Sequence, residues 1–289
     1  MSVAIAPARA RARRGGVLPT LVLAVGALYC VLPALWVLVA ATKNPQELFS
    51  TDTFAPSFNG GLAANVTALL EYNDGVFLSW VLNSLLFAGI GTVLSVFFSA
   101  AAGYALAVYR FPGREAIFTT ILAGVLIPQI ALAIPQYQLL SALDLVGSYW
   151  SVLLPLLVSP FSIYLCRVFA AATVPPEILE AGRIDGAGDL RLFWSVGLRL
   201  MTPGLVTVFL LQFVAIWTNF MLPYIMLSNE RMFPLTVGLF TLLNRGAGQA
   251  ALYTLVITGS LLSIVPLILC FLLLQRYWRL DVLSGGLKG

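Results

Sequence analysis

Six apolar runs alternate with more polar segments along the 289 residues of the chain. A membrane-spanning helix needs about 20 consecutive, mostly apolar residues. The first run contains no charged residue over its whole length. The runs occupy residues 17–41, 80–109, 116–134, 148–171, 204–227 and 250–275. The pattern therefore predicts an all-α, polytopic membrane protein with six transmembrane helices.

Prolines and polar residues refine this pattern. The third run carries Pro128 and is expected to form one span, whereas Pro155 and Pro160 predict kinks in the fourth, because proline removes a backbone donor. The polar stretch 43–79 is expected to be a loop with one short helix near residues 62–72. Residues 135–147 are expected to form a short helix or loop outside the membrane.

Composition supports a membrane protein and excludes several other classes. Hydrophobic residues make up 60% of the chain and charged residues 10%, with a mean hydropathy of +0.95. The net charge of +4 comes from scattered basic residues rather than one basic face, so no nucleic-acid partner is expected. The sequence has no histidine and no paired cysteine motif. We therefore expect no catalytic residue, no metal site and no cofactor in this chain.

The positions of lysine and arginine predict the orientation in the membrane. Loops on the cytoplasmic side retain an excess of these residues. If the N-terminus is cytoplasmic, the inner segments hold thirteen of them and the outer segments three. The predicted organisation is a cytoplasmic arm (1–16), a six-helix transmembrane domain (17–275) and a cytoplasmic tail (276–289). Both termini are thus expected in the cytoplasm.

Residues 173–203, here called the charged segment, separate the fourth and fifth runs. The segment holds seven charged side chains. At roughly 3 kcal/mol for each charge at the bilayer centre, burying all seven in lipid would cost on the order of 20 kcal/mol. The charged segment must therefore lie outside the membrane, and the orientation above places it in the cytoplasm.

Within the charged segment the sequence predicts a helix, a turn and a second helix. Pro176 fits the first turn of a helix, where its missing N–H costs nothing, and Glu177 favours the positive end of the helix dipole. Gly186 stands where the chain would leave this helix. Asp189 is expected to cap a second helix that continues through Trp194.

One face of the first predicted helix is narrow and almost free of bulky side chains. Ile178, Ala181, Gly182 and Asp185 follow a helical spacing. Such a face permits close approach of another protein. The alternative is a helix lying on lipid headgroups, but these small residues would bury little apolar area there.

The residues around this face resemble a known motif. Residues 180–187, with the sequence EAGRIDGA, followed by Phe193, Val196, Leu198 and Pro203, resemble the EAA loop of bacterial ABC importer permeases. The resemblance extends from about residue 17 to the end of the chain and is greatest to carbohydrate permeases of the maltose-permease G-subunit type. Two positions depart from the family pattern: Gly182 replaces an alanine, and Arg199 replaces a proline.

The resemblance implies a type I ABC importer permease fold in a bacterial inner membrane. It implies a permease subunit that imports a sugar or sugar-derived solute, forms half of the pathway and pairs with a second permease as a heterodimer. Two cytoplasmic ATPase subunits would bind ATP and magnesium, and an extracytoplasmic binding protein would deliver the solute. This chain has no GxxxxGK[ST] phosphate loop, so the hydrolytic step is expected in the partner. The implied coupling interface consists of Ile178, Glu180, Ala181, Gly182, Asp185, Gly186 and Ala187.

Polar residues inside the apolar runs are the candidates for a translocation pathway. We expect Asn83, Gln129, Gln212, Trp217, Thr218 and Asn219 to contribute to it. Interhelical hydrogen bonding is the alternative role, because it uses the same residue types. Asn219 beside Trp217 is the favoured pair, since an amide next to an aromatic ring suits a sugar.

Other hypotheses remain open from the sequence. A stand-alone secondary transporter or channel would call for charged residues within the spans, and an intramembrane enzyme for a nucleophile with a base. The resemblance also implies that Gly286, Leu287, Lys288 and Gly289 reach between the ATPase subunits, whereas a chain end without a partner frays.

Overall fold

The computed structural model describes residues 17–245 and 249–277, and in these ranges all regular structure is helical. The longer helices are α1 (Val17–Ala41), α4 (Val76–Val108), α8 (Pro160–Thr173), α11 (Leu198–Trp217) and α14 (Ala250–Leu274). The shorter ones are α2 (Glu47–Ser50), α3 (Gly61–Glu71), α5 (Arg114–Val125), η1 (Gln129–Leu132), α6 (Ala133–Ala142), α7 (Tyr149–Leu156), α9 (Pro176–Ile184), α10 (Asp189–Leu192), α12 (Met221–Met226), η3 (Glu230–Met232), α13 (Leu235–Arg245) and η4 (Gln275–Tyr277). A π-helical turn, Phe193–Gly197, joins α10 to α11.

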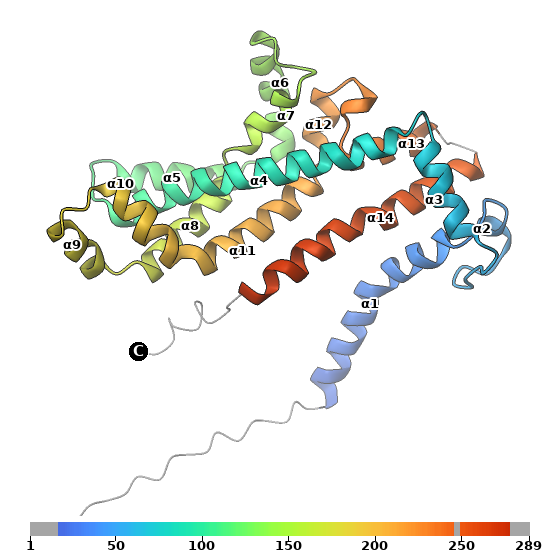
Figure 1. Ribbon diagram of the computed structural model, residues 1–289, viewed down its shortest axis with the longest axis horizontal. Coiled ribbons are helices and arrows are strands. Elements are labelled where there is room, and N and C mark those ends of the chain that lie inside the picture. Colours follow the sequence, from blue (N-terminus) through green and yellow to red (C-terminus); the bar gives the residue numbers. More distant parts are fainter. Residues whose placement is uncertain (1–16, 246–248, 278–289) are drawn as a thin grey trace, which may run out of the picture.

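Helices α4, α8, α11 and α14 run in roughly the same direction, whereas α1 is inclined to them and α6, α7 and α12 project from the middle of the bundle (Figure 1). Helices α9 and α10 lie at one end, and α2, α3 and α13 lie at the opposite end. Helix α4 passes along much of this length and packs against both α8 and α11. The charged segment and the predicted polar stretch 43–79 thus lie at opposite ends of the molecule, as a membrane protein requires.

The third apolar run does not form one continuous span, so that prediction was wrong. Helix α5 ends at Val125, and the chain then continues as η1 and α6 in a direction that differs by 102°. Pro128 precedes the new helical segment in an extended conformation, with ψ at 127°. A residue in this conformation cannot continue a helix, which explains the break.

The fourth and fifth runs are also interrupted. Helix α7 ends at Leu156 and α8 begins at Pro160, which confirms a disruption near the two prolines. The fifth span begins earlier than the predicted residue 204, because α11 starts at Leu198, and it stops at Trp217 before the separate helix α12. Five described helical segments are long and apolar enough to cross a membrane, or six when the bent pair α5 and η1–α6 counts as one.

Two hydrophobic cores stabilise the two halves of the helix bundle. The first, here the outer core, surrounds Trp80, Phe87 and Leu242 near the end that carries α3 and α13. The second, here the inner core, surrounds Tyr104 and Leu192 beneath α9 and α10. Helix α4 contributes to both, so the two halves share one continuous helix.

Close contact between α4 and α8 depends on a residue without a side chain. A Cβ atom added at Gly103 would lie 2.6 Å from the backbone nitrogen of Arg167 and 2.6 Å from the Cβ of Cys166. Atoms cannot approach so closely, so any larger residue would push the helices apart. Small residues serve the same purpose between membrane helices in general.

Candidate functional site

Helix α9 has a defined start and stop, as the sequence predicted. Pro176 is its first residue, after Pro175 in an extended conformation. At its other end the N–H of Gly186 donates to the carbonyl of Arg183 at 3.0 Å, and the N–H of Ala187 donates to that of Gly182 at 2.9 Å. Gly186 has a φ of +79°, which glycine adopts without strain. These two bonds form the Schellman motif that ends helices.

One side of α9 is anchored and the other is exposed. Leu179 is 3% exposed and packs in the inner core, together with Val174 just before the helix. Ile178 is 44% exposed and Ile184 is 87% exposed. The helix therefore presents apolar side chains to its surroundings while the buried leucine fixes its position.

The predicted small-residue face is divided between these two sides. Ile178, Ala181 and Asp185 are exposed, but Gly182 is half-buried and faces the chain itself. A Cβ at Gly182 would lie 2.5 Å from Cδ2 of Leu192. The glycine that departs from the family pattern is thus the point at which α9 approaches α10, and an alanine would require Leu192 to shift.

Asp189 does not cap the second helix, so this prediction was wrong. Gly188 occupies the cap position without a side-chain bond, and Asp189 is the first helical residue. Its carboxylate instead accepts a hydrogen bond from Arg183 at 3.3 Å, which links the two short helices. Burial raises the pKa of the nearby Tyr109 phenol above its usual range, and the charge of Asp189 acts in the same direction.

The second helix of the charged segment continues into the membrane-spanning part. Helix α10, the π-helical turn and α11 follow one another without a gap from Asp189 to Trp217. Arg199 is exposed in the first turn of α11, where a proline stands in the family pattern. The helix is therefore continuous at Arg199. After the turn that ends α9, one uninterrupted helix leads from Asp189 to the region around Gln212.

A cavity of about 320 Å³ lies where several helices are interrupted. The break after α5, the break between α7 and α8, and the end of α11 with α12 all contribute to its lining. Ser159 caps α8 by accepting from the N–H of Ser162 at 3.3 Å. Interrupted membrane helices free backbone and side-chain polar groups, and such breaks are tolerated where they line a cavity.

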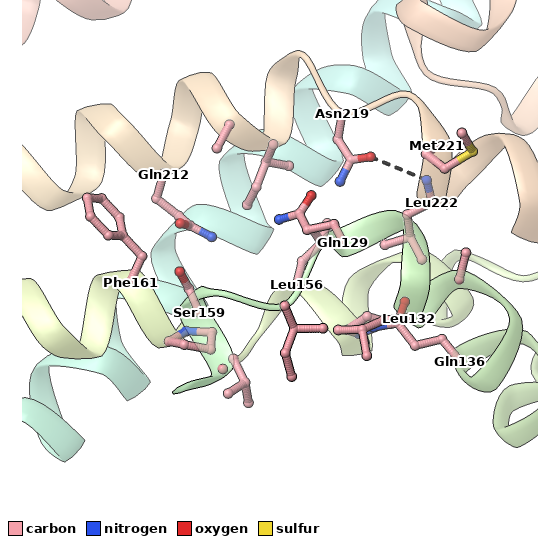
Figure 2. A pocket seen from close by; sticks show the side chains of 18 of the residues that line it. Gln129, Leu132, Gln136, Leu156, Ser159, Phe161, Gln212, Asn219, Met221 and Leu222 are labelled. Atoms are coloured by element: carbon pink, nitrogen blue, oxygen red, sulfur yellow. Dashed lines mark hydrogen bonds between the residues drawn. The ribbon is translucent and has the colours of Figure 1, made fainter. Parts of the chain in front are cut away.

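Three of the six predicted pathway residues meet in this cavity. Gln129 lies in η1, Gln212 in α11 and Asn219 just after α11, and Figure 2 shows their side chains extending toward a common space. Gln212 is buried, and its Oε1 accepts from the hydroxyl of Ser162 at 3.0 Å. Asn219 accepts from the N–H of Leu222 at 3.4 Å. The cavity thus gathers carboxamides from separate parts of the sequence.

The other three predicted pathway residues do not line the cavity. Asn83 donates to the carbonyls of Arg231 and Phe233 at 2.8 and 3.1 Å, and it accepts from Tyr149 at 3.0 Å. Trp217 is buried, and its Nε1 donates to a carbonyl on α14 at 3.2 Å. Thr218 is exposed and donates to its own helix at 2.8 Å. Asn83 and Trp217 thus make the hydrogen bonds between helical segments that were the alternative for them.

Sequence reasoning missed several cavity residues. Gln136 and Ser159 line the cavity, and so does the ring of Phe161. Gln136 was assigned to an external segment because the third run was expected to span the membrane unbroken. The proline at position 128 followed by two glutamines within eight residues is the signal that could have indicated the break. The predicted tail residues 286–289 lie outside the described residues.

The interrupted helices, the central cavity and the projecting helix α9 define a subunit of a membrane transporter. Residues 95–279 match the family described as binding-protein-dependent transport system inner membrane component. The chain belongs to this family, which supports an importer permease over a stand-alone secondary transporter or channel.

Individual relatives agree with this assignment. The chain is 35% identical over 266 residues to the arabinooligosaccharides transport system permease protein AraQ of Halalkalibacterium halodurans, covering 91% of this chain and 93% of that protein. It is 29% identical to the sn-glycerol-3-phosphate transport system permease protein UgpE of Yersinia pestis, covering 89% and 92%. A solved chain from a bacterial ABC transporter involved in the import of alginate matches with a TM-score of 0.79 at 23% identity, covering 95% of this chain and all of that one. The fold is therefore that of an ABC importer permease.

Proposed function

We propose that this chain is the permease subunit of an ATP-driven importer of a sugar or sugar-derived solute, and that α9 couples it to a cytoplasmic ATPase. The observation that carries the coupling is the construction of α9. A buried leucine holds a short helix whose exposed side carries Ile178, Glu180 and Ala181. A projecting helix of this kind suits the groove of a partner protein.

The distribution of charge supports a cytoplasmic position for α9. This helix lies at the end opposite α2, α3 and α13, and the three basic residues assigned to the outside, Lys43, Arg231 and Arg245, belong to segments next to or within those outer elements. Under the positive-inside rule, the end that carries α9 then faces the cytoplasm, where ATP is available. Both termini would lie on that side as well.

The assembly proposed around this chain has three further kinds of component. A second permease would complete the pathway as a heterodimer, and two ATPase subunits would bind ATP and magnesium. An extracytoplasmic binding protein would present the solute at the end with α3 and α13. A sugar is the favoured solute class, because AraQ, which is named as a permease for arabinooligosaccharides, is the more similar of the two relatives.

Charge reversal on α9 tests the coupling. Glu180→Lys should reduce both ATPase association and solute import by about tenfold, because a changed charge in a docked helix disfavours the original partner. The matched control is Glu71→Lys, which reverses an exposed glutamate at the last residue of α3, at the other end of the molecule. ATPase association is measured by co-purification and import by uptake into proteoliposomes containing the full importer. Normal association and import by Glu180→Lys would refute the coupling role.

A further inference from the structure

The cavity has a chemical character that restricts the charge of its solute. Among the described residues that line it there is no aspartate, glutamate, lysine or arginine. Its polar side chains are Gln129, Gln136, Ser159, Gln212 and Asn219, and the rest of the lining is apolar. The volume of about 320 Å³ lies at the lower end of the range for small-molecule sites, about 300–1,000 Å³.

Several hydrogen-bonding groups in the cavity are available to a solute. Each carboxamide has two N–H donors and one acceptor oxygen. The oxygens of Gln212 and Asn219 are engaged by Ser162 and Leu222, which leaves their NH₂ groups without a hydrogen bond to the described residues. The carboxamides of Gln129 and Gln136 make no hydrogen bond to the described residues, so their donors and their acceptor oxygens are both available. Donors and acceptors together match hydroxyl groups, which also donate and accept.

An anionic solute would find no compensating charge in this cavity. A carboxylate or phosphate that leaves water needs a cation or several strong hydrogen bonds to offset the loss of hydration. The basic residue further along α8, Arg167, already pairs with Glu115 at 3.1 Å and lies 3.5 Å from the centroid of the Phe118 ring. It does not line the cavity. Neutral amides alone leave an anion at a disadvantage relative to an uncharged molecule.

We propose that the cavity is a binding site for an uncharged, polyhydroxylated solute and that it discriminates against solutes carrying carboxylate or phosphate groups. This inference rests on the proposed function, since it concerns the solute that the importer moves. It goes beyond the family assignment, because the solutes named for the two relatives include both an uncharged sugar oligomer and a phosphate ester. The discrimination belongs to this subunit and adds to that of any binding protein.

The charge preference can be measured without knowing the solute. Gln136→Cys places a thiol in the cavity, and Gln138→Cys places one two residues away on the same helix, where the side chain is exposed and does not line the cavity. Each variant of the full chain, assembled with its partners, is treated with a neutral and with an anionic methanethiosulfonate reagent of similar size. The unmodified chain gives the background from Cys30, Cys166 and Cys270.

The quantity of interest is the rate with the neutral reagent divided by the rate with the anionic reagent. We expect this ratio to be about tenfold higher at Gln136→Cys than at Gln138→Cys, which corresponds to a difference of about 1.4 kcal/mol. Asn219→Cys, on the other side of the cavity, should show the same increase in the ratio. It replaces Gln136→Cys as the test variant if that variant fails to assemble with its partners. The proposal would be overturned if the rate ratios at both cavity positions differed from the ratio at Gln138→Cys by less than twofold.

The outcome separates the charge preference from the proposed function. If the full importer moves no sugar but the ratio is raised at both cavity positions, the sugar assignment fails and the preference for uncharged molecules stands. If sugar is imported but the ratio is unchanged, the cavity does not select by charge, and the proposed function stands without this inference.

Discussion

Two regions of the helix bundle are built on different principles. At one end α9 is a regular helix with a proline start and a glycine stop, fixed by Leu179 in the inner core. The cavity instead lies where helices are interrupted, and its polar side chains come from segments far apart in the sequence. Local sequence rules therefore describe the first region well, whereas the second depends on how broken helices meet.

One continuous stretch of helix joins these regions. Residues Asp189–Trp217 run from the base of α9 to the cavity, with the π-helical turn Phe193–Gly197 near the α9 end. π-helical turns often occur at functional sites. Because each region has its own hydrophobic core, a substitution in one core should affect mainly the function of that region. The following predictions test this separation.

The largest effect is expected when the anchor of α9 is shortened. Leu179→Ala removes a side chain that is 3% exposed and should cost about 2–5 kcal/mol, mostly by loosening α9. Hydrogen exchange in residues 176–192 should accelerate, and ATPase co-purification should fall by more than tenfold. Ile184→Ala is the control for exchange, because this side chain is 87% exposed and contributes no core packing. If exchange near the cavity rose equally with Leu179→Ala, the two regions would not be independent.

A smaller effect is expected at the turn that ends α9. Gly186 has a φ of +79°, so Gly186→Val should cost about 1–2 kcal/mol or more and misdirect the chain toward α10. Gly186→Asn is the matched control, because asparagine tolerates this backbone conformation better than other residues. Import and ATPase association should fall for valine and remain near normal for asparagine. Equal losses for both variants would show that contact with a partner, rather than backbone strain, limits this position.

The smallest effect is expected at Ser162, which holds the cavity residue Gln212 by a hydrogen bond. Ser162→Ala removes the hydrogen bond to Gln212 and should cost about 0.5–1.5 kcal/mol. The thermal midpoint of the purified chain should fall by a few degrees, roughly 2–4 °C per kcal/mol for a chain of 150–250 residues. Solute import should fall because Gln212 loses its fixed orientation, while ATPase association stays normal. Reduced association in this variant would contradict the separation of the two regions.

Several features were predictable because they follow from local chemistry. The first, second and last apolar runs, the helix at Gly61–Glu71, the start of α9 at Pro176 and the turn at Gly186 all match the structure closely. Each depends on residues near one another in the chain. The same local reasoning failed at Asp189, where Arg183 across the turn competes for the carboxylate.

The composition of the cavity could not be predicted in the same way. Gln129, Gln212 and Asn219 were recognised as polar residues in apolar runs. Asn83 is also a polar residue in an apolar run, but its hydrogen bonds join helix α4 to the segment that precedes α13. Gln136 lines the cavity because the chain bends by 102° after α5, and composition does not encode that angle. A polar residue in an apolar run satisfies its hydrogen bonds either in a cavity or in a neighbouring helix.

The sequence by itself thus determined that the chain spans a membrane, and that the charged segment begins with a short helix that ends just before Gly186. These features depend on hydropathy and on backbone preferences, which act over a few residues. Only the tertiary structure decided that Gly182 faces Leu192 rather than outward, and that four carboxamides line a cavity without charged side chains while Asn83 and Trp217 lie outside it. The reason is that burial and hydrogen-bond partners are set by contacts between distant segments, and these exist only after the helices have packed.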